Sequence, residues 1–101
     1  MTTDIKEKEE EVMISLDGRL DAASTKDFEE AIQPFLTKEG VKIMIDCDKL
    51  FYICSSGLRS FMLLLKEVTK NSGSIVIRNM RSEVKEVFDM TGFTSIFNIK
   101  K

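Results

Sequence analysis

A strand, a helix and a second strand are encoded in residues 41–78, which read VKIMIDCDKLFYICSSGLRSFMLLLKEVTKNSGSIVIR. Apolar residues alternate over residues 41–46, as in a central strand that is covered on both faces. Over residues 56–70 they recur at helical spacing and form a broad apolar stripe. Residues 71–73 end that helix, and residues 74–78 form a short strand. Because helical crossovers between strands are almost always right-handed, the two strands are expected to lie parallel in one sheet.

The residues before this unit add two strands and a helix. Residues 5–11 are dense in Lys and Glu, which indicates a charged edge strand or, as the alternative, a frayed tail. Residues 12–17 alternate as in a strand that is expected to end at a turn at Asp17-Gly18. A capping box that starts at Ser24 is expected to begin a helix, and Pro34 is expected to kink or stop it.

The residues after the unit predict a third helix. Ser82 is expected to cap it, Val84 and Phe88 to face inward, and Gly92 to close it before a short last strand. Strands therefore alternate with helices along the chain. This order predicts an α/β fold: a mixed, mainly parallel sheet of four or five strands flanked by helices.

Composition limits the function. The chain has 101 residues, enough for a single domain over residues 1–101 with one modest core. Its formal net charge is -2, which is the opposite of what nucleic-acid binding requires. No histidine is present, so His-dependent triads and His-ligated metals are excluded. We expect a protein without enzymatic activity, metal or cofactor.

The two cysteines and the apolar segments indicate location. Cys47 and Cys54 fit neither a zinc pattern nor a disulfide framework, and they are expected to be small buried hydrophobes in a reducing cytoplasm. The longest apolar run, residues 61–65, is too short to insert into a membrane, and it could face the core or a second copy. We expect a monomer or a weak dimer. The pair Asp46 and Asp48 lacks a third ligand, so a role in a turn is favoured over a cation site.

Two loops qualify as sites because they follow strands and lead into helices. One is Gly18-Arg19-Leu20-Asp21, where Asp21 could simply cap the next segment. The other is Cys54-Ser55-Ser56-Gly57, which brings two hydroxyls to a helix start. One of the two serines would cap the helix, which contributes roughly 1 kcal/mol, and the helix N-terminus would also tolerate a phosphate on the other serine if that one is exposed. From spacing alone, plain capping ranks above a switch.

The order and spacing of several motifs resemble the STAS family over essentially the whole chain. These motifs are Gly18-Arg19-Leu20-Asp21, the strand at residues 41–46, Cys54-Ser55-Ser56-Gly57-Leu58 and Val87-Phe88-Asp89-Met90-Thr91-Gly92-Phe93. More narrowly, the chain is similar to a stand-alone bacterial anti-sigma factor antagonist. The resemblance implies that the unphosphorylated protein binds an anti-sigma factor and thereby frees sigma for transcription.

The same resemblance implies roles for residues of the second loop. The phosphorylated residue of the family aligns with Ser55, the second hydroxyl with Ser56, and the turn glycine with Gly57, while Asp21 aligns with an acidic residue nearby. The implied kinase is the anti-sigma factor itself, and the implied enzyme that removes the phosphate is a metal-dependent serine phosphatase. We expect a shallow contact surface that includes Arg19, Leu20, Leu58 and the exposed face of the second helix.

This sequence departs from the family at two positions. Cys54 stands where the family usually has Asp, which removes a negative charge beside the phosphoacceptor. Arg59 stands where smaller residues are common, and it either pairs with a phosphate or is solvated. An alternative function is a STAS accessory subunit of a membrane transport complex that binds its ATPase without phosphorylation. An enzyme using Ser55 or Cys54 is the weakest alternative, because nothing near them activates a nucleophile.

Overall fold

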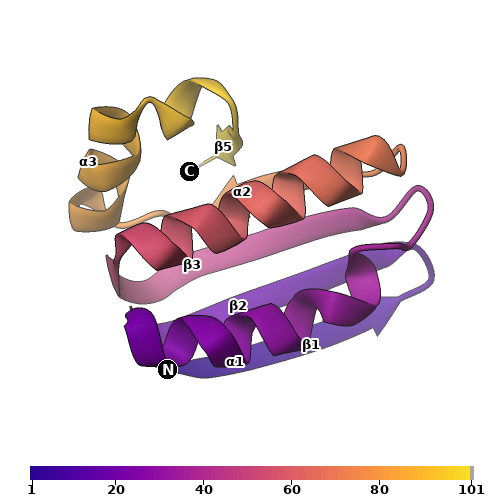
Figure 1. Ribbon diagram of the computed structural model, residues 1–101, viewed down its shortest axis with the longest axis horizontal. Helices are drawn as coiled ribbons and strands as arrows, with labels where there is room; N and C mark the ends of the chain where they lie inside the picture. Colours follow the sequence, from indigo (N-terminus) through magenta and orange to yellow (C-terminus); the bar gives the residue numbers. More distant parts are fainter. Residues whose placement is uncertain (101) are drawn as a thin grey trace.

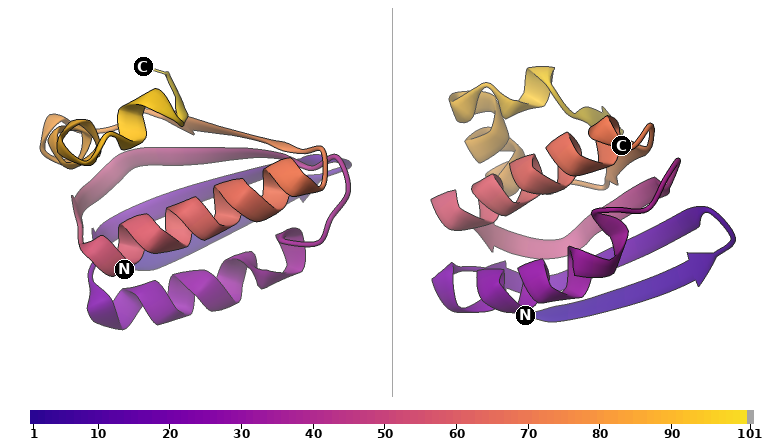
Figure 2. Two further views of the ribbon diagram at one scale, coloured as in Figure 1. Left: turned by 45° about the horizontal axis from the view of Figure 1, so that its top comes forward. Right: turned by 45° about the vertical axis from the view of Figure 1, so that its right-hand side comes forward.

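The chain folds into one five-stranded sheet with three helices, as a computed structural model describes for residues 1–100 (Figures 1 and 2). The sheet order is β1-β2-β3-β4-β5, with β1 antiparallel to β2 and all other neighbours parallel. The predicted fold class is confirmed. The elements are β1 (Thr2–Lys8), β2 (Glu11–Leu20), α1 (Ala22–Ile32), η1 (Gln33–Phe35), β3 (Lys42–Ile53), α2 (Ser55–Lys70), β4 (Ser74–Arg78), α3 (Ser82–Thr91), η2 (Phe93–Ser95) and β5 (Asn98–Lys100).

The core lies between the sheet and the helices. Alternate residues of β2 and β3 are buried there, and β3 is central, as expected. Each helix adds one fully buried ring, with centroids 5.5 Å apart for Phe28 and Phe61 and 5.9 Å for Phe61 and Phe88. Such aromatic contacts require α1, α2 and α3 to pack on the same face of the sheet.

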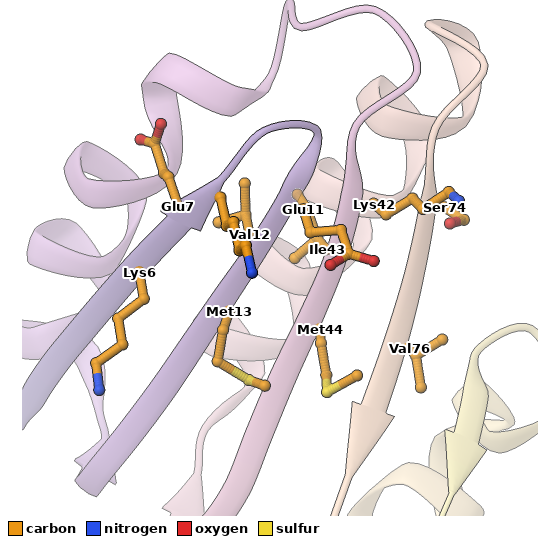
Figure 3. A pocket seen from close by; sticks show the side chains of 11 residues that line it. Lys6, Glu7, Glu11, Val12, Met13, Lys42, Ile43, Met44, Ser74 and Val76 are labelled. Atoms are coloured by element: carbon orange, nitrogen blue, oxygen red, sulfur yellow. The ribbon is translucent and has the colours of Figure 1, made fainter.

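The opposite face of the sheet carries no helix within residues 1–100. Met13, Met44 and Val76 project from β2, β3 and β4 into a shallow hollow of about 350 Å³, which Figure 3 shows. The expectation that residues 41–46 are covered on both faces is therefore wrong. Lys42, Met44 and Asp46 of this strand point to the open side, and the alternation was masked by the apolar Met44.

Strand β2 continues through the predicted turn at Asp17-Gly18. Gly18 has φ 120° and lies between two irregularities in the pairing with β3, so it forms a bulge that the strand crosses. The prediction of a turn is wrong for this reason. As a result Arg19 pairs with Tyr52 and Leu20 with Ile53, and β2 and β3 end side by side at their carboxyl ends.

The N-caps of α1 and α3 differ from prediction, while the predicted helix ends at Pro34 and Gly92 are confirmed. The N-caps of α1 and α3 are Asp21 and Arg81, so Ser24 and Ser82 lie inside their helices. Helix α1 ends at Ile32, and Pro34 is the second residue of the 3-10 turn Gln33–Phe35 that follows it. Gly92 closes α3 with φ 80°. The charged N-terminal segment is an edge strand, although it ends at Lys8.

Candidate functional site

The N-terminus of α1 is closed by a reciprocal pair of hydrogen bonds. Asp21 Oδ1 accepts from the Ser24 N–H at 3.0 Å, and Ser24 Oγ accepts from the Asp21 N–H at 3.0 Å. This is a capping box, although Asp21 and not Ser24 is its N-cap. Thr25 Oγ1 donates to the Asp21 carbonyl at 2.7 Å. The alternative that Asp21 caps the segment after it is therefore confirmed.

The N-terminus of α2 is closed differently. Its N-cap is Cys54, whose side chain makes no capping hydrogen bond. The Cys54 Sγ instead lies 3.0 Å from Ser56 Oγ. The expectation that one of the two serines caps this helix is therefore wrong, because Ser55 and Ser56 are already its first two residues.

The two helix starts lie side by side at one end of the sheet (Figure 1). The Cys54 N–H donates to the Leu20 carbonyl at 3.0 Å, which joins the two loops. Thr25 Oγ1 and Ser56 Oγ are 3.4 Å apart, so hydroxyls of α1 and α2 meet. One turn further along α2, Ser60 Oγ donates to Glu29 Oε1 at 2.9 Å. These contacts bring together the two loops that the sequence singled out.

Three of the predicted site residues form the packed floor of this site. Leu20 is fully buried and Leu58 is 5% exposed, so the expectation that they contribute side chains to an exposed surface is wrong. A Cβ on Gly57 would lie 2.8 Å from Leu20 Cδ2 and 3.0 Å from Ile53 Cγ1. Only glycine allows α2 to begin this close to the end of β2.

The two hydroxyls of the second loop have different surroundings. Ser55 is exposed, and its hydroxyl makes no hydrogen bond within residues 1–100. Ser56 is half-buried and lies against Cys54 and Thr25. Of the two, Ser55 is the one that another protein can reach.

The two arginines among the predicted site residues are both exposed. The Arg19 guanidinium stacks 4.2 Å from the centroid of the Tyr52 ring, which holds this exposed cation against the sheet. Arg59 is exposed on the first turns of α2, four residues after Ser55. Neither arginine forms an ion pair with a carboxylate in the part of the chain described.

Hydrogen bonding shifts the pKa of two groups at this site. The pKa of Asp21 is lowered, mainly because its carboxylate accepts the Ser24 N–H. Partial burial alone would raise the pKa of the Cys54 thiol, but the Ser56 hydroxyl and the backbone N–H groups of Gly57 and Ser56 near the sulfur favour the thiolate and lower the pKa overall. By contrast, deep burial raises the pKa of Cys47 to about 12.

Other candidate sites are weaker. No group of three or more potential metal-ligating His, Cys, Asp or Glu side chains occurs in residues 1–100. Asp46 Oδ1 accepts the Asp48 N–H at 3.0 Å and the Asn79 side-chain amide at 3.2 Å. Asp46 and Asp48 both lie inside β3, at an irregularity in its pairing with β2, so the predicted turn at this pair is wrong. None of the helices described is both long and apolar enough to span a bilayer. The hollow of Figure 3 lies at the start of β3, the opposite end from Cys54.

Sequence reasoning missed Thr25 and Tyr52. Thr25 is 4% exposed and connects the two helix starts. Correct identification of Asp21 as the N-cap would have placed Thr25 at the position that bonds back to it. Tyr52 was missed because the strand was expected to end at Asp46, whereas β3 continues to Ile53.

Comparisons with known proteins agree with the observed fold. The model of the STAS domain matches residues 2–101. The chain belongs to the STAS family. An anti-sigma-B factor antagonist of Bacillus subtilis is 28% identical over 99 residues, which cover 98% of this chain and 90% of the relative. This full-length relative of the STAS protein is an anti-sigma factor antagonist, a class of binding proteins and not of enzymes.

Solved structures share the fold. The anti-sigma factor antagonist SpoIIAA in its unphosphorylated form matches with a TM-score of 0.84 and 20% identity, covering 99% of this chain and 89% of that one. SpoIIAA of Bacillus in its phosphorylated form matches with a TM-score of 0.77 and 20% identity, covering 99% and 92%. These likenesses establish the STAS fold for this chain.

Proposed function

We propose that this STAS protein is an anti-sigma factor antagonist whose binding is switched off by phosphorylation of Ser55. The observation that carries the proposal is the contrast between an exposed Ser55 with an unengaged hydroxyl and a half-buried Ser56. The similarity to an anti-sigma-B factor antagonist supports an anti-sigma factor as the class of partner. The unphosphorylated chain would bind an anti-sigma factor and release sigma.

The surroundings of Ser55 support a stable phosphorylated form. Ser55 is the first residue of the 16-residue helix α2, where free N–H groups and the helix dipole favour a negative charge. Arg59 lies one turn further on the same face, within the i,i+4 spacing at which side chains pair. A phosphate would therefore leave the fold of the antagonist intact, and its effect would fall on the interface.

The energetic effect on binding follows from desolvation. A phosphate adds a charge of about -1.5 to -2 at neutral pH. Burying such a charge without a partner costs several kcal/mol, and each ~1.4 kcal/mol weakens binding tenfold. A micromolar complex would be lost.

The proposal includes the enzymes that set the switch. The anti-sigma factor acts as the serine kinase, and a metal-dependent phosphatase restores the free hydroxyl; both would act in the bacterial cytoplasm. Cys54 lies where the family usually has a carboxylate, so here the kinase must accept a thiol with a lowered pKa beside the phosphoacceptor.

The test is binding to the purified cognate anti-sigma factor. Ser55→Ala is expected to bind like the unmodified protein and to take up no phosphate from ATP. Ser55→Asp is expected to bind at least about tenfold more weakly. Ser82→Asp is the matched control, because Ser82 is also exposed and is also the first residue of a helix. Calorimetric titration measures all three.

Equal affinities of Ser55→Ala and Ser55→Asp would contradict the proposal. Intact mass of the protein from its native cells, before and after phosphatase treatment, gives an independent check. A persistent absence of phosphate, together with copurification of a transport ATPase, would instead favour the accessory-subunit function.

A further inference from the structure

The exposed face of α2 carries a continuous stripe that begins at Ser55. We call it the α2 stripe and define it by Arg59, Met62, Leu63, Lys66 and Lys70, all of which are exposed. Ser55, Arg59, Met62 and Lys66 follow one another at spacings of four, three and four residues. Residues so spaced lie above one another on one side of a helix.

The middle of the stripe is apolar. Met62 and Leu63 are each 39% exposed, whereas their neighbours Phe61 and Leu64 are fully buried. The segment after α3 extends this apolar surface, because Ile96 is 46% exposed. Together with Leu65 it borders a hollow of about 540 Å³ whose other walls are Met62, Lys66, Thr69 and Lys70.

The rim of the stripe is cationic. Helix α2 has three cations, Arg59, Lys66 and Lys70, and a single carboxylate, Glu67, which is half-buried. From the facing helix α1, Glu29 is half-buried and accepts from Ser60. The three cations of α2 form no ion pair within residues 1–100. The stripe is thus positive on a chain whose formal net charge is -2.

We propose that the α2 stripe binds an acidic amphipathic segment of the partner protein. The inference rests on the proposed function, since the partner is taken to be the anti-sigma factor that covers Ser55. Apolar side chains of that segment would cover Met62, Leu63 and Ile96, while its carboxylates would pair with Arg59, Lys66 and Lys70.

Charge and continuity favour this occupant over others. A second copy related by two-fold symmetry would bring the same face, with its cations, against itself. An anionic membrane would match the charge, but the stripe offers few apolar side chains to insert and no Trp or Phe. The stripe is also continuous with the phosphorylation site of the proposed function, which a protein partner must cover for the switch to act.

The stripe explains how one phosphate controls the whole interface. A phosphate on Ser55 would lie next to Arg59 and neutralise it. The same phosphate would repel the carboxylates of the incoming segment. Phosphorylation of Ser55 therefore weakens the binding of an acidic partner segment more than it would weaken the binding of a neutral one.

The experiment reverses the charge of the stripe. The double variant Arg59→Glu/Lys66→Glu is compared with Lys6→Glu/Lys8→Glu, which changes net charge equally on the exposed edge strand β1. The stripe variant is expected to bind the anti-sigma factor at least about tenfold more weakly, with the control unchanged. The conservative variant Arg59→Lys/Lys66→Arg is expected to retain binding, and circular dichroism confirms that each variant is folded.

Salt dependence gives a second measurement. Raising KCl from about 50 to about 500 mM is expected to weaken binding of the unmodified protein and to have little effect on the stripe variant. Unchanged affinity of the stripe variant, alongside weakened binding of Ser55→Asp, would overturn this inference and leave the proposed function standing. No binding of the unmodified chain, or no effect of either variant, would overturn both.

The other occupants are tested with the same variants. Cosedimentation with phosphatidylglycerol vesicles is measured for the unmodified protein, the control variant and the stripe variant. Loss of cosedimentation in the stripe variant alone would assign the stripe to a membrane and overturn the inference. Sedimentation equilibrium that shows a dimer dissociated by the same charge reversal would assign it to a second copy, with the same consequence.

Discussion

Helices α1 and α2 begin in nearly the same way and are used differently. Their N-caps have almost identical backbone angles, φ -99° and ψ -174° at Asp21 and φ -96° and ψ 175° at Cys54. At α1 the carboxylate of Asp21 closes the first turn in a capping box. At α2 the Cys54 side chain makes no capping bond, and the next residue, Ser55, is exposed.

The difference separates stability from binding. The α1 start is saturated with internal hydrogen bonds, including one from Ser24 Oγ to the Arg19 carbonyl at 2.7 Å. The α2 start leaves its first hydroxyl unengaged while Gly57 packs it tightly onto Leu20. A rigid base below a free hydroxyl is suited to a modification that changes an interface without unfolding the protein.

The largest expected effect concerns the two thiols. Cys54 is half-buried with a lowered pKa, whereas Cys47 is fully buried with a raised one. We expect iodoacetamide to alkylate Cys54 faster than Cys47, on the order of a hundredfold or more in the native state. The rate at Cys54 should reach its half-maximum at a lower pH than that of an unperturbed thiol, because its pKa is lowered. Peptide mass spectrometry over a pH series measures both; comparable rates would contradict the environments described.

The next effect tests the packing below Ser55. Gly57→Val is expected to destabilise the protein by about 1–3 kcal/mol, because its Cβ would press on Leu20 and Ile53. Ser55→Ala, two residues earlier on the same helix, is the control and should change stability by less than about 0.5 kcal/mol. Urea unfolding monitored by circular dichroism gives both values, and an unchanged midpoint for Gly57→Val would show that α2 is not packed so closely.

A smaller effect tests the α1 cap. Asp21→Ala is expected to lower Tm by roughly 4 to 8 °C at neutral pH, because the Ser24 N–H loses its acceptor. The folded-state pKa of Asp21 is lowered, so the stabilisation is complete above the unfolded pKa of about 3.9 and is lost as the pH falls through the folded value. The Tm difference from the unmodified protein should thus be constant near neutrality and shrink below about pH 4. A difference that does not depend on pH would rule out the carboxylate as its source.

The smallest expected effect concerns a substitution that gives α2 an aspartate N-cap like that of α1. Since the two N-caps share backbone angles, an aspartate at position 54 has the geometry to cap α2. Cys54→Asp is expected to raise Tm by about 2 to 4 °C relative to Cys54→Ala, which offers no capping oxygen. Differential scanning calorimetry measures the difference, and a lower Tm for the aspartate variant would show that the two helix starts are not equivalent.

The sequence predicted the elements whose signals are local. The helical spacing of α2, the strand β4, the stop at Pro34 and the cap at Gly92 all depend on residues near one another in the chain. The family motifs likewise located the two loops. Because each of these signals spans only a few residues, no knowledge of tertiary contacts was needed.

The rest depended on contacts between distant segments. The ends of β2 and β3 extend past their apolar alternation because Gly18 bulges and the strands pair with each other. Leu20 was expected at the surface, yet the approach of Gly57 buries it. The N-cap of α1 was misassigned because both Asp21 and Ser24 are good capping residues, and only the hydrogen bonds distinguish them.

The role of Ser55 is tested by titrating one protein sample in two states. The protein is phosphorylated with the anti-sigma factor kinase and ATP, and mass spectrometry maps the phosphate to Ser55. Half of the sample is then treated with phosphatase, which restores the free Ser55 hydroxyl. We predict that the phosphorylated half binds the anti-sigma factor at least about a hundredfold more weakly, with an unchanged Tm for the antagonist alone. Equal affinity in the two halves, or tighter binding by the phosphorylated one, would contradict the proposed switch.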